Sequence, residues 1–161
     1  MKHLRFLLPF LAILLPAVVS AQTKTIQIAG VSRTYILHAP SGVTNPPLVL
    51  NIHGYNMDAA SEQSYTKMDQ IADREKFIVV YPNAINKSWD MSGANDFTFL
   101  LAIIDTMDKK YKIDRTRVYA CGFSQGGCCI EAPVCRSCEV RFDRWDPFFG
   151  FTTPLANLLA F

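Results

Sequence analysis

The sequence predicts an α/β fold with a mainly parallel sheet, flanking helices and an N-terminal hairpin. Continuous apolar runs, which are typical of strands buried on both faces, alternate with segments of helical periodicity. Near the N-terminus, two runs of alternating polarity flank the turn Ala29-Gly30-Val31-Ser32, as in a β-hairpin. Strands that alternate with helices indicate βαβ units and therefore parallel strand pairing.

Each element of this fold has its own local signal. Strands are expected at 25–28, 33–37, 48–52, 77–81 and 117–121. Amphipathic helices are expected at 61–76 and 97–112, where apolar residues recur at intervals of three and four. Ser61 or Ser64 can cap the start of the first helix, and Asp96 that of the second. A further helix should begin close after the last strand.

The first 21 residues have the order of a signal peptide. A basic start precedes the apolar run 6–19, and Val19-Ser20-Ala21 offers small residues for cleavage before Gln22. We expect a secreted or periplasmic protein with no stable membrane anchor after cleavage. The alternative, an uncleaved anchor, is disfavoured because the run is short and contains Pro9 and Pro16.

Charge and length restrict the class of partner. The formal net charge is +2, and the basic residues are scattered, so the sequence does not indicate a nucleic-acid-binding surface. About 140 residues remain after residue 21, enough for one modest domain with a buried core. The expected partner is a small molecule or a polymer.

The segment 128–161 differs from the rest of the chain. It has no sustained helical or strand period and is expected to be weakly ordered. Four of the five cysteines lie between Cys128 and Cys138. The pair Cys135 and Cys138 forms a C-x-x-C motif, but neither the ligand spacing of a zinc site nor a redox βαβ context accompanies it. No metal site is therefore predicted.

The stretch Gly122-Phe123-Ser124-Gln125-Gly126 matches the G-x-S-x-G pattern directly after a predicted strand. In this context the glycines permit a sharp turn from strand to helix, and the turn presents the serine hydroxyl at the edge of the sheet. The alternative is a glycine-rich turn with an incidental serine. The strand before the motif favours Ser124 as a catalytic nucleophile.

A second predicted strand ends at His53-Gly54, in the position that supplies the other part of such a site. The main-chain N–H groups of Gln125 and Tyr55 are the candidate oxyanion-hole donors. His53 is expected to fix the loop rather than act as a base, because in this layout the base follows the serine. Trp89 is either an aromatic platform for substrate at the mouth of the site or an ordinary packing residue.

Several segments together resemble secreted polyhydroxybutyrate depolymerases and feruloyl esterases of the α/β-hydrolase type. They are Arg33-Thr34-Tyr35, 47–54, 77–82, Ser88-Trp89, Asn95-Asp96-Phe97 and 111–127. The resemblance covers residues 25–127, and residues 22–127 are taken as the N-terminal part of the hydrolase domain. It implies a serine carboxyl-ester hydrolase acting on a polyester, an aryl ester or an acetylated carbohydrate. It implies no metal or organic cofactor.

The sequence departs from this family after Gly127. The three histidines of the chain all precede Ser124, so no triad histidine is recognisable, and Asp143 and Asp146 lie too close behind the serine for the family's acid loop. The favoured interpretation is a truncated or frame-shifted, inactive form. The alternatives are a secreted non-catalytic protein that binds carbohydrate or polyester, and a cysteine-cluster metal protein.

Overall fold

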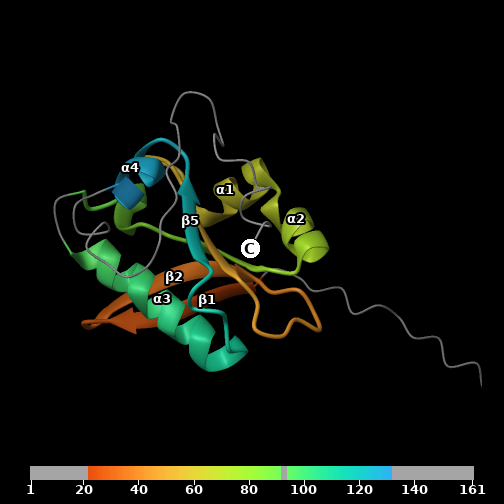
Figure 1. Cartoon of the computed structure of the whole chain (residues 1–161). Helices are drawn as coiled ribbons and strands as arrows, with labels where there is room; N and C mark the ends of the chain where they lie inside the picture. Colours follow the sequence, from red (N-terminus) through yellow and green to blue (C-terminus); the bar gives the residue numbers. More distant parts are fainter. Residues whose placement is uncertain (1–21, 92–93, 132–161) are drawn as a thin grey trace, which may run out of the picture.

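A five-stranded sheet forms the centre of the molecule, with the strand order β1-β2-β4-β3-β5 (Figure 1). The computed structural model describes residues 22–91 and 94–131. The strands are β1 (Gln22–Ile28), β2 (Val31–His38), β3 (Leu48–Ile52), β4 (Ile78–Pro82) and β5 (Val118–Gly122). The predicted signal peptide and most of the predicted tail, including Asp143, Asp146 and the C-x-x-C motif, lie outside the described residues.

The sheet is mixed. Strands β4, β3 and β5 run parallel to one another, whereas β1 and β2 form the predicted hairpin and β2 pairs antiparallel with β4. Only the central part is therefore parallel. Ile52 pairs with Gly122, so β3 and β5 end at the same edge of the sheet. Within the described ranges, β5 has a strand partner on one side.

Helices cover both faces of the sheet (Figure 1). Helices α1 (Ala59–Thr66) and α2 (Met68–Glu75) lie on one face, and α3 (Asn95–Tyr111) and α4 (Gln125–Glu131) on the other. The larger core cluster lies on the α3 side, where Leu50, Ile103 and Met107 are fully buried. A short 3-10 helix, η1 (Ile85–Lys87), follows β4.

The predicted helix at 61–76 is two helices. Lys67 has a φ angle of 49°, in the left-handed region, and this residue ends α1 before α2 begins. The predicted caps Ser61 and Ser64 are wrong, because the N-cap is Asp58, whose Oδ1 accepts from the N–H of Ser61 at 2.9 Å. An aspartate at this position satisfies an N–H that has no partner inside the helix.

The cap predicted for α3 is also wrong. The N-cap is Ala94, with no side-chain hydrogen bond, and Asp96 lies within the first turn. The Asp96 carboxylate instead accepts from Arg33 and from the N–H of Asp90. Helix α4 continues to Glu131, past the predicted domain boundary at residue 127.

In the described ranges, the longest helix falls short of what an apolar membrane span requires. This finding concerns residues 22–91 and 94–131 alone.

Candidate active site

Ser124 lies in a sharp turn between β5 and α4. Its φ angle is 50°, in the left-handed region that residues with a Cβ seldom adopt. Main-chain N–H groups of Phe123, Gly126 and Cys128 donate across the turn, to Ile52 O (3.0 Å), Phe123 O (2.9 Å) and Ser124 O (3.2 Å) respectively. Ser124 is exposed. A strand, a strained exposed serine and a helix make up the geometry of a nucleophile elbow.

Two glycines let α4 approach the strand ends closely. A Cβ on Gly126 would lie 2.6 Å from the carbonyl oxygen of His53, and a Cβ on Gly122 would lie 2.7 Å from the carbonyl carbon of Gly126. Neither glycine has a positive φ angle. Glycine is therefore required for space at both positions, and the left-handed conformation belongs to Ser124.

The loop after β3 brings Tyr55 to the same edge of the sheet as Ser124. Gly54 packs against the residue before the serine, since a Cβ on Gly54 would lie 2.8 Å from Cδ1 of Phe123. Among the described residues, the main-chain N–H groups of Tyr55 and Gln125 donate to no protein acceptor. These two N–H groups, one in the loop after β3 and one at the start of α4, remain the predicted oxyanion-hole donors.

His53 is fully buried, and both of its ring nitrogens are engaged. The N–H of Ala84 donates to Nε2 at 3.1 Å, so Nδ1 carries the proton and donates to the carbonyl oxygen of Gly54 at 2.7 Å. Burial lowers the pKa of the His53 imidazole from its ordinary value, a shift partly opposed by the hydrogen bond to Gly54. The free electron pair of this neutral ring faces Ala84, so it is not available to deprotonate Ser124.

His38 is the other histidine in the described part of the chain. It lies near the starts of the parallel strands, whereas Ser124 lies near their ends. It pairs with Val79 near the start of β4, whereas Ser124 follows the end of the parallel strand β5. Its Nε2 is 2.8 Å from Oδ1 of Asp73, and its Nδ1 is 3.6 Å from Oδ2 of Asp69. This buried histidine therefore links β2 to α2 and takes no part at the elbow.

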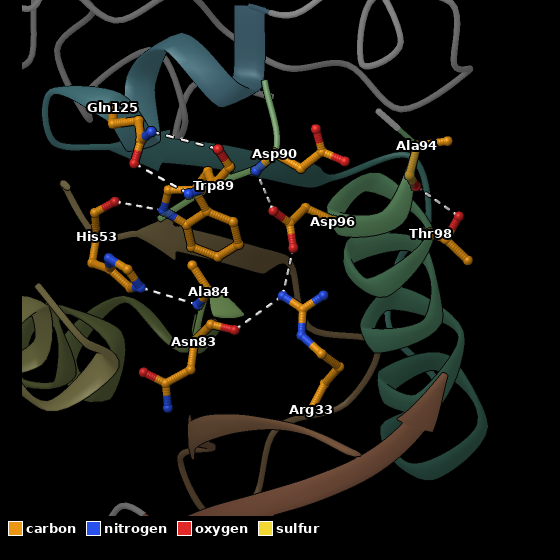
Figure 2. Close-up of polar contacts among 10 residues, drawn as sticks. All are labelled: Arg33, His53, Asn83, Ala84, Trp89, Asp90, Ala94, Asp96, Thr98 and Gln125. Carbon is orange, nitrogen blue, oxygen red and sulfur yellow. Dashed lines mark hydrogen bonds and ion pairs between the residues drawn. The ribbon is translucent and has the colours of Figure 1, made fainter. Parts of the chain in front are cut away.

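Trp89 lies between the two loops that carry the candidate oxyanion donors (Figure 2). Its indole N–H donates to the carbonyl oxygen of His53 at 2.7 Å, and its main-chain N–H donates to Oε1 of Gln125 at 3.1 Å. The rings of Trp89 and His53 are tilted, with centroids 4.9 Å apart. Trp89 is only 3% exposed, which favours the packing interpretation over the substrate platform.

A buried ion pair anchors the segment after Trp89 (Figure 2). Nη2 of Arg33 donates to Oδ1 of Asp96 at 2.6 Å and to the carbonyl oxygen of Asn83 at 3.1 Å. The N–H of Asp90 donates to Oδ2 of Asp96 at 2.6 Å. Sequence reasoning missed this pair, because its partners are 63 positions apart and no local pattern joins them.

Glu62 is a second residue that sequence reasoning missed. Its carboxyl group is buried between α1 and the sheet, Oε2 has no hydrogen-bond partner, and burial raises its pKa to about 7. Burial, with a smaller contribution from Glu62, raises the pKa of the Cys121 thiol to about 12. Cys121 and Cys128 are free thiols. No cluster of three or more potential metal ligands occurs in the described residues.

An aromatic pair flanks the serine on its α1 side. The rings of Tyr65 and Phe123 have centroids 5.7 Å apart and are inclined at 55°. Tyr65 is 68% exposed and Phe123 is 38% exposed, although large apolar groups are usually buried. The elbow therefore presents an accessible aromatic surface next to Ser124.

The curated proteins that this chain resembles in sequence include esterases. No family model matches the chain. It is 43% identical over 101 residues to a bifunctional acetylxylan esterase/xylanase of Neocallimastix patriciarum, a match covering 61% of this chain and 15% of that protein. It is 31% identical over 94 residues to feruloyl esterase B of Thermothelomyces thermophilus, covering 52% of this chain and 32% of that protein.

Comparisons in structure agree. A thermostable esterase superposes with a TM-score of 0.62 at 21% identity, over 74% of this chain and 38% of that chain. The acetyl xylan esterase from Aspergillus awamori gives a TM-score of 0.59 at 18% identity, over 69% of this chain and 46% of that chain. The fold is thus that of an α/β-hydrolase, of which the chain has the N-terminal portion.

The predicted resemblance is confirmed at this level. The chain is similar to feruloyl and acetylxylan esterases, and its scaffold is of the carboxyl-ester hydrolase type. The chain spans about a third or less of the length of the two curated relatives named above.

Proposed function

We propose that the chain supplies the nucleophile and the oxyanion hole of a serine carboxyl-ester hydrolase. The observation that carries this proposal is Ser124, exposed and held at a φ angle of 50° between β5 and α4. Its Oγ attacks the ester carbonyl carbon, and the N–H groups of Tyr55 and Gln125 stabilise the resulting oxyanion. Collapse of this intermediate expels the alcohol and leaves an acyl-serine, which water then hydrolyses.

The rate of this reaction depends on a base that takes the proton of Ser124. No histidine follows Ser124 in the chain, and His53 and His38 are both engaged elsewhere. We therefore propose that this chain alone is inactive or weakly active. An oxyanion hole without a complete triad retains a rate on the order of 10³ to 10⁴ above water.

Chemical rescue by an external base tests both parts of the proposal. Hydrolysis of p-nitrophenyl acetate is followed with increasing imidazole, for the unaltered chain and for Ser124→Ala. The difference between the two proteins removes the background reaction of imidazole, and it is expected to grow with imidazole concentration. Identical rates at every concentration would contradict Ser124 as the nucleophile. Fast Ser124-dependent turnover without imidazole would instead reveal a base in this chain.

The finer substrate class is also a proposal. The exposed pair Tyr65 and Phe123 favours the aryl ester among the three expected classes, because an aryl group can stack on aromatic rings. The test compares binding of methyl ferulate, an acetylated xylo-oligosaccharide and a 3-hydroxybutyrate oligomer to Ser124→Ala. Equal affinity for all three, or preference for either of the others, would contradict the aryl class.

The same aromatic surface supports a second candidate, a non-catalytic binding protein. Binding needs the exposed rings but no base, and so it is compatible with the engaged histidines. Binding of one of the three ligands by the unaltered chain, without any Ser124-dependent hydrolysis at high imidazole, would favour this function. Tyr65→Ala should then weaken binding.

We also propose export, on the basis of the order of residues 1–21. Expression in a secreting host should yield a product whose first residue is Gln22. A product that keeps residues 1–21 would contradict cleavage.

A further inference from the structure

The side-chain amide of Gln125 forms hydrogen bonds with the segment around Trp89. Its Oε1 accepts from the main-chain N–H of Trp89 at 3.1 Å, while its Nε2 donates to Oγ of Ser88 at 3.2 Å and to the carbonyl oxygen of Trp89 at 3.4 Å. Figure 2 shows the amide facing the main chain of Trp89. The residue directly after the serine is thus tied to the connection between β4 and α3.

The indole of Trp89 makes the complementary contact with the other loop. It donates to the carbonyl oxygen of His53, two residues before Tyr55, and the N–H of Ala84 binds the His53 ring from the same connection. One segment therefore contacts both loops that carry candidate oxyanion donors. Its other end is held by Asp96, which accepts from the N–H of Asp90.

We propose that Trp89 and the side chain of Gln125 are positioning residues that hold the N–H groups of Tyr55 and Gln125 at a fixed separation, an inference that rests on the function proposed above. Oxyanion donors must lie within about 2.7–3.1 Å of the oxygen. A misplacement of about 1 Å can lower the rate on the order of 10²-fold. Tyr55 lies in the loop after β3 and Gln125 is the first residue of α4. The hydrogen bonds of Trp89 to His53 and Gln125 link these two places directly, and so they help to set the spacing of the donors.

Two substitutions separate this role from ordinary packing. Trp89→Phe keeps an aromatic ring but removes the bond to His53, and leaves the main-chain bond to Gln125 possible. Gln125→Met keeps the length of the side chain but removes its bonds to Ser88 and Trp89. Ile103→Val, on the buried face of α3, is the control for a general loss of stability.

Amide hydrogen exchange provides a readout that does not depend on catalysis. The reporters are the N–H of Met57, bonded to Gly54 in one loop, and the N–H of Gly126, bonded to Phe123 in the other. Each of the two variants should accelerate exchange at both reporters by about tenfold, because each removes a bond that links the loops. Ile103→Val should leave the two reporters unchanged relative to amides of β4.

The decisive measurement is exchange at the reporter on the side opposite to the bond that each substitution removes. Faster amide exchange at Met57 in Gln125→Met, and at Gly126 in Trp89→Phe, supports the proposal that Trp89 and Gln125 together hold both donor segments. Acceleration confined to the loop whose own bond was removed, or equal acceleration in Ile103→Val, would overturn it. In the imidazole-rescued hydrolysis, the variants should lower kcat with KM unchanged. Failure of that hydrolysis in the unaltered chain would count against the proposed function, and the exchange result would still decide the positioning role.

Discussion

The guanidinium of Arg33 and the carboxylate of Asp96 form an ion pair with an N–O distance of 2.6 Å, and both residues are 3% exposed. The guanidinium also lies 4.0 Å from the centroid of the Phe99 ring. Through Asp96 this pair joins β2 to the main chain at Asp90 (Figure 2). A buried charge that loses its partner is costly, so the pair makes the fold sensitive to either residue.

Asp96→Asn should therefore lower the free energy of unfolding by about 3 kcal/mol, because it leaves the charge of Arg33 buried without a counter-charge. The double variant Arg33→Met with Asp96→Leu should lose less of the free energy of unfolding, since it removes both charges together. Urea denaturation followed by circular dichroism measures both. Arg115→Met is the control, because Arg115 pairs with Asp105 and Asp108 at the surface, and such pairs contribute less than about 1 kcal/mol. Equal losses in Asp96→Asn and Arg115→Met would contradict the role of burial.

The elements that could be predicted from sequence are those with a local cause. The strand 48–52 has five buried residues in a row, and the hairpin has alternating polarity around its turn, so both patterns were sufficient. The elbow was predictable because Gly122 and Gly126 flank Ser124 in a short pattern, although the main chain that Gly126 approaches, at Ile52 and His53, is distant in the sequence. Each of these features is thus marked by a local pattern.

The features that could not be predicted have no such local pattern. The break at Lys67 needs a left-handed residue that carries a side chain, which no propensity favours. Asp96 resembles a helix cap locally, and only the distant Arg33 explains its position. The burial of Trp89 likewise follows from bonds to loops 36 positions away, and the sequence left its two interpretations open.

Glu62 predicts an unusual dependence of stability on pH. Its pKa is about 7 in the folded protein, against an ordinary value of 4.5. Between these values the unfolded chain releases the proton and the folded chain keeps it, so stability falls as pH rises, by at most about 1.4 kcal/mol per pH unit. Above a pH of about 7 both states are ionised, and the loss is constant.

Glu62→Gln should therefore be more stable than the unaltered chain at pH 8, by on the order of 2 kcal/mol after allowance for solvent screening. The two proteins should differ little at pH 4, where Glu62 is neutral in both states. Thermal unfolding at a series of pH values measures the difference. Glu75→Gln removes a carboxylate near the surface of α2, and its stability should change with pH in the same way as that of the unaltered chain. A constant difference across the pH range would contradict a proton held by Glu62.

Gly126→Ala tests the close approach of α4 to the strand ends. The added Cβ would overlap the carbonyl oxygens of Ile52 and His53, so α4 and the elbow must shift. We expect a loss of about 2 to 3 kcal/mol in the free energy of unfolding. Gly30→Ala is the matched control, because it has a φ angle of 81° but open space around its Cα, and should cost about 1 kcal/mol. A smaller loss at Gly126 than at Gly30 would show that α4 does not pack as described.

The last prediction concerns the strain at Ser124 itself. A φ angle of 50° costs a residue with a Cβ about 1 kcal/mol or more, whereas glycine adopts it freely. Ser124→Gly should therefore be more stable than Ser124→Ala by about 1 kcal/mol, a difference reduced by the greater freedom of glycine in the unfolded chain. Both variants lack the hydroxyl, so any Ser124-dependent hydrolysis should be absent from both. Ser64 is exposed in the middle of α1 and serves as the control. There Ser64→Ala should be more stable than Ser64→Gly, because alanine has a higher helix propensity than glycine by about 1 kcal/mol. Urea denaturation of the four variants measures the two differences. If alanine were the more stable residue at both positions, Ser124 would not be held in the left-handed conformation on which the elbow depends.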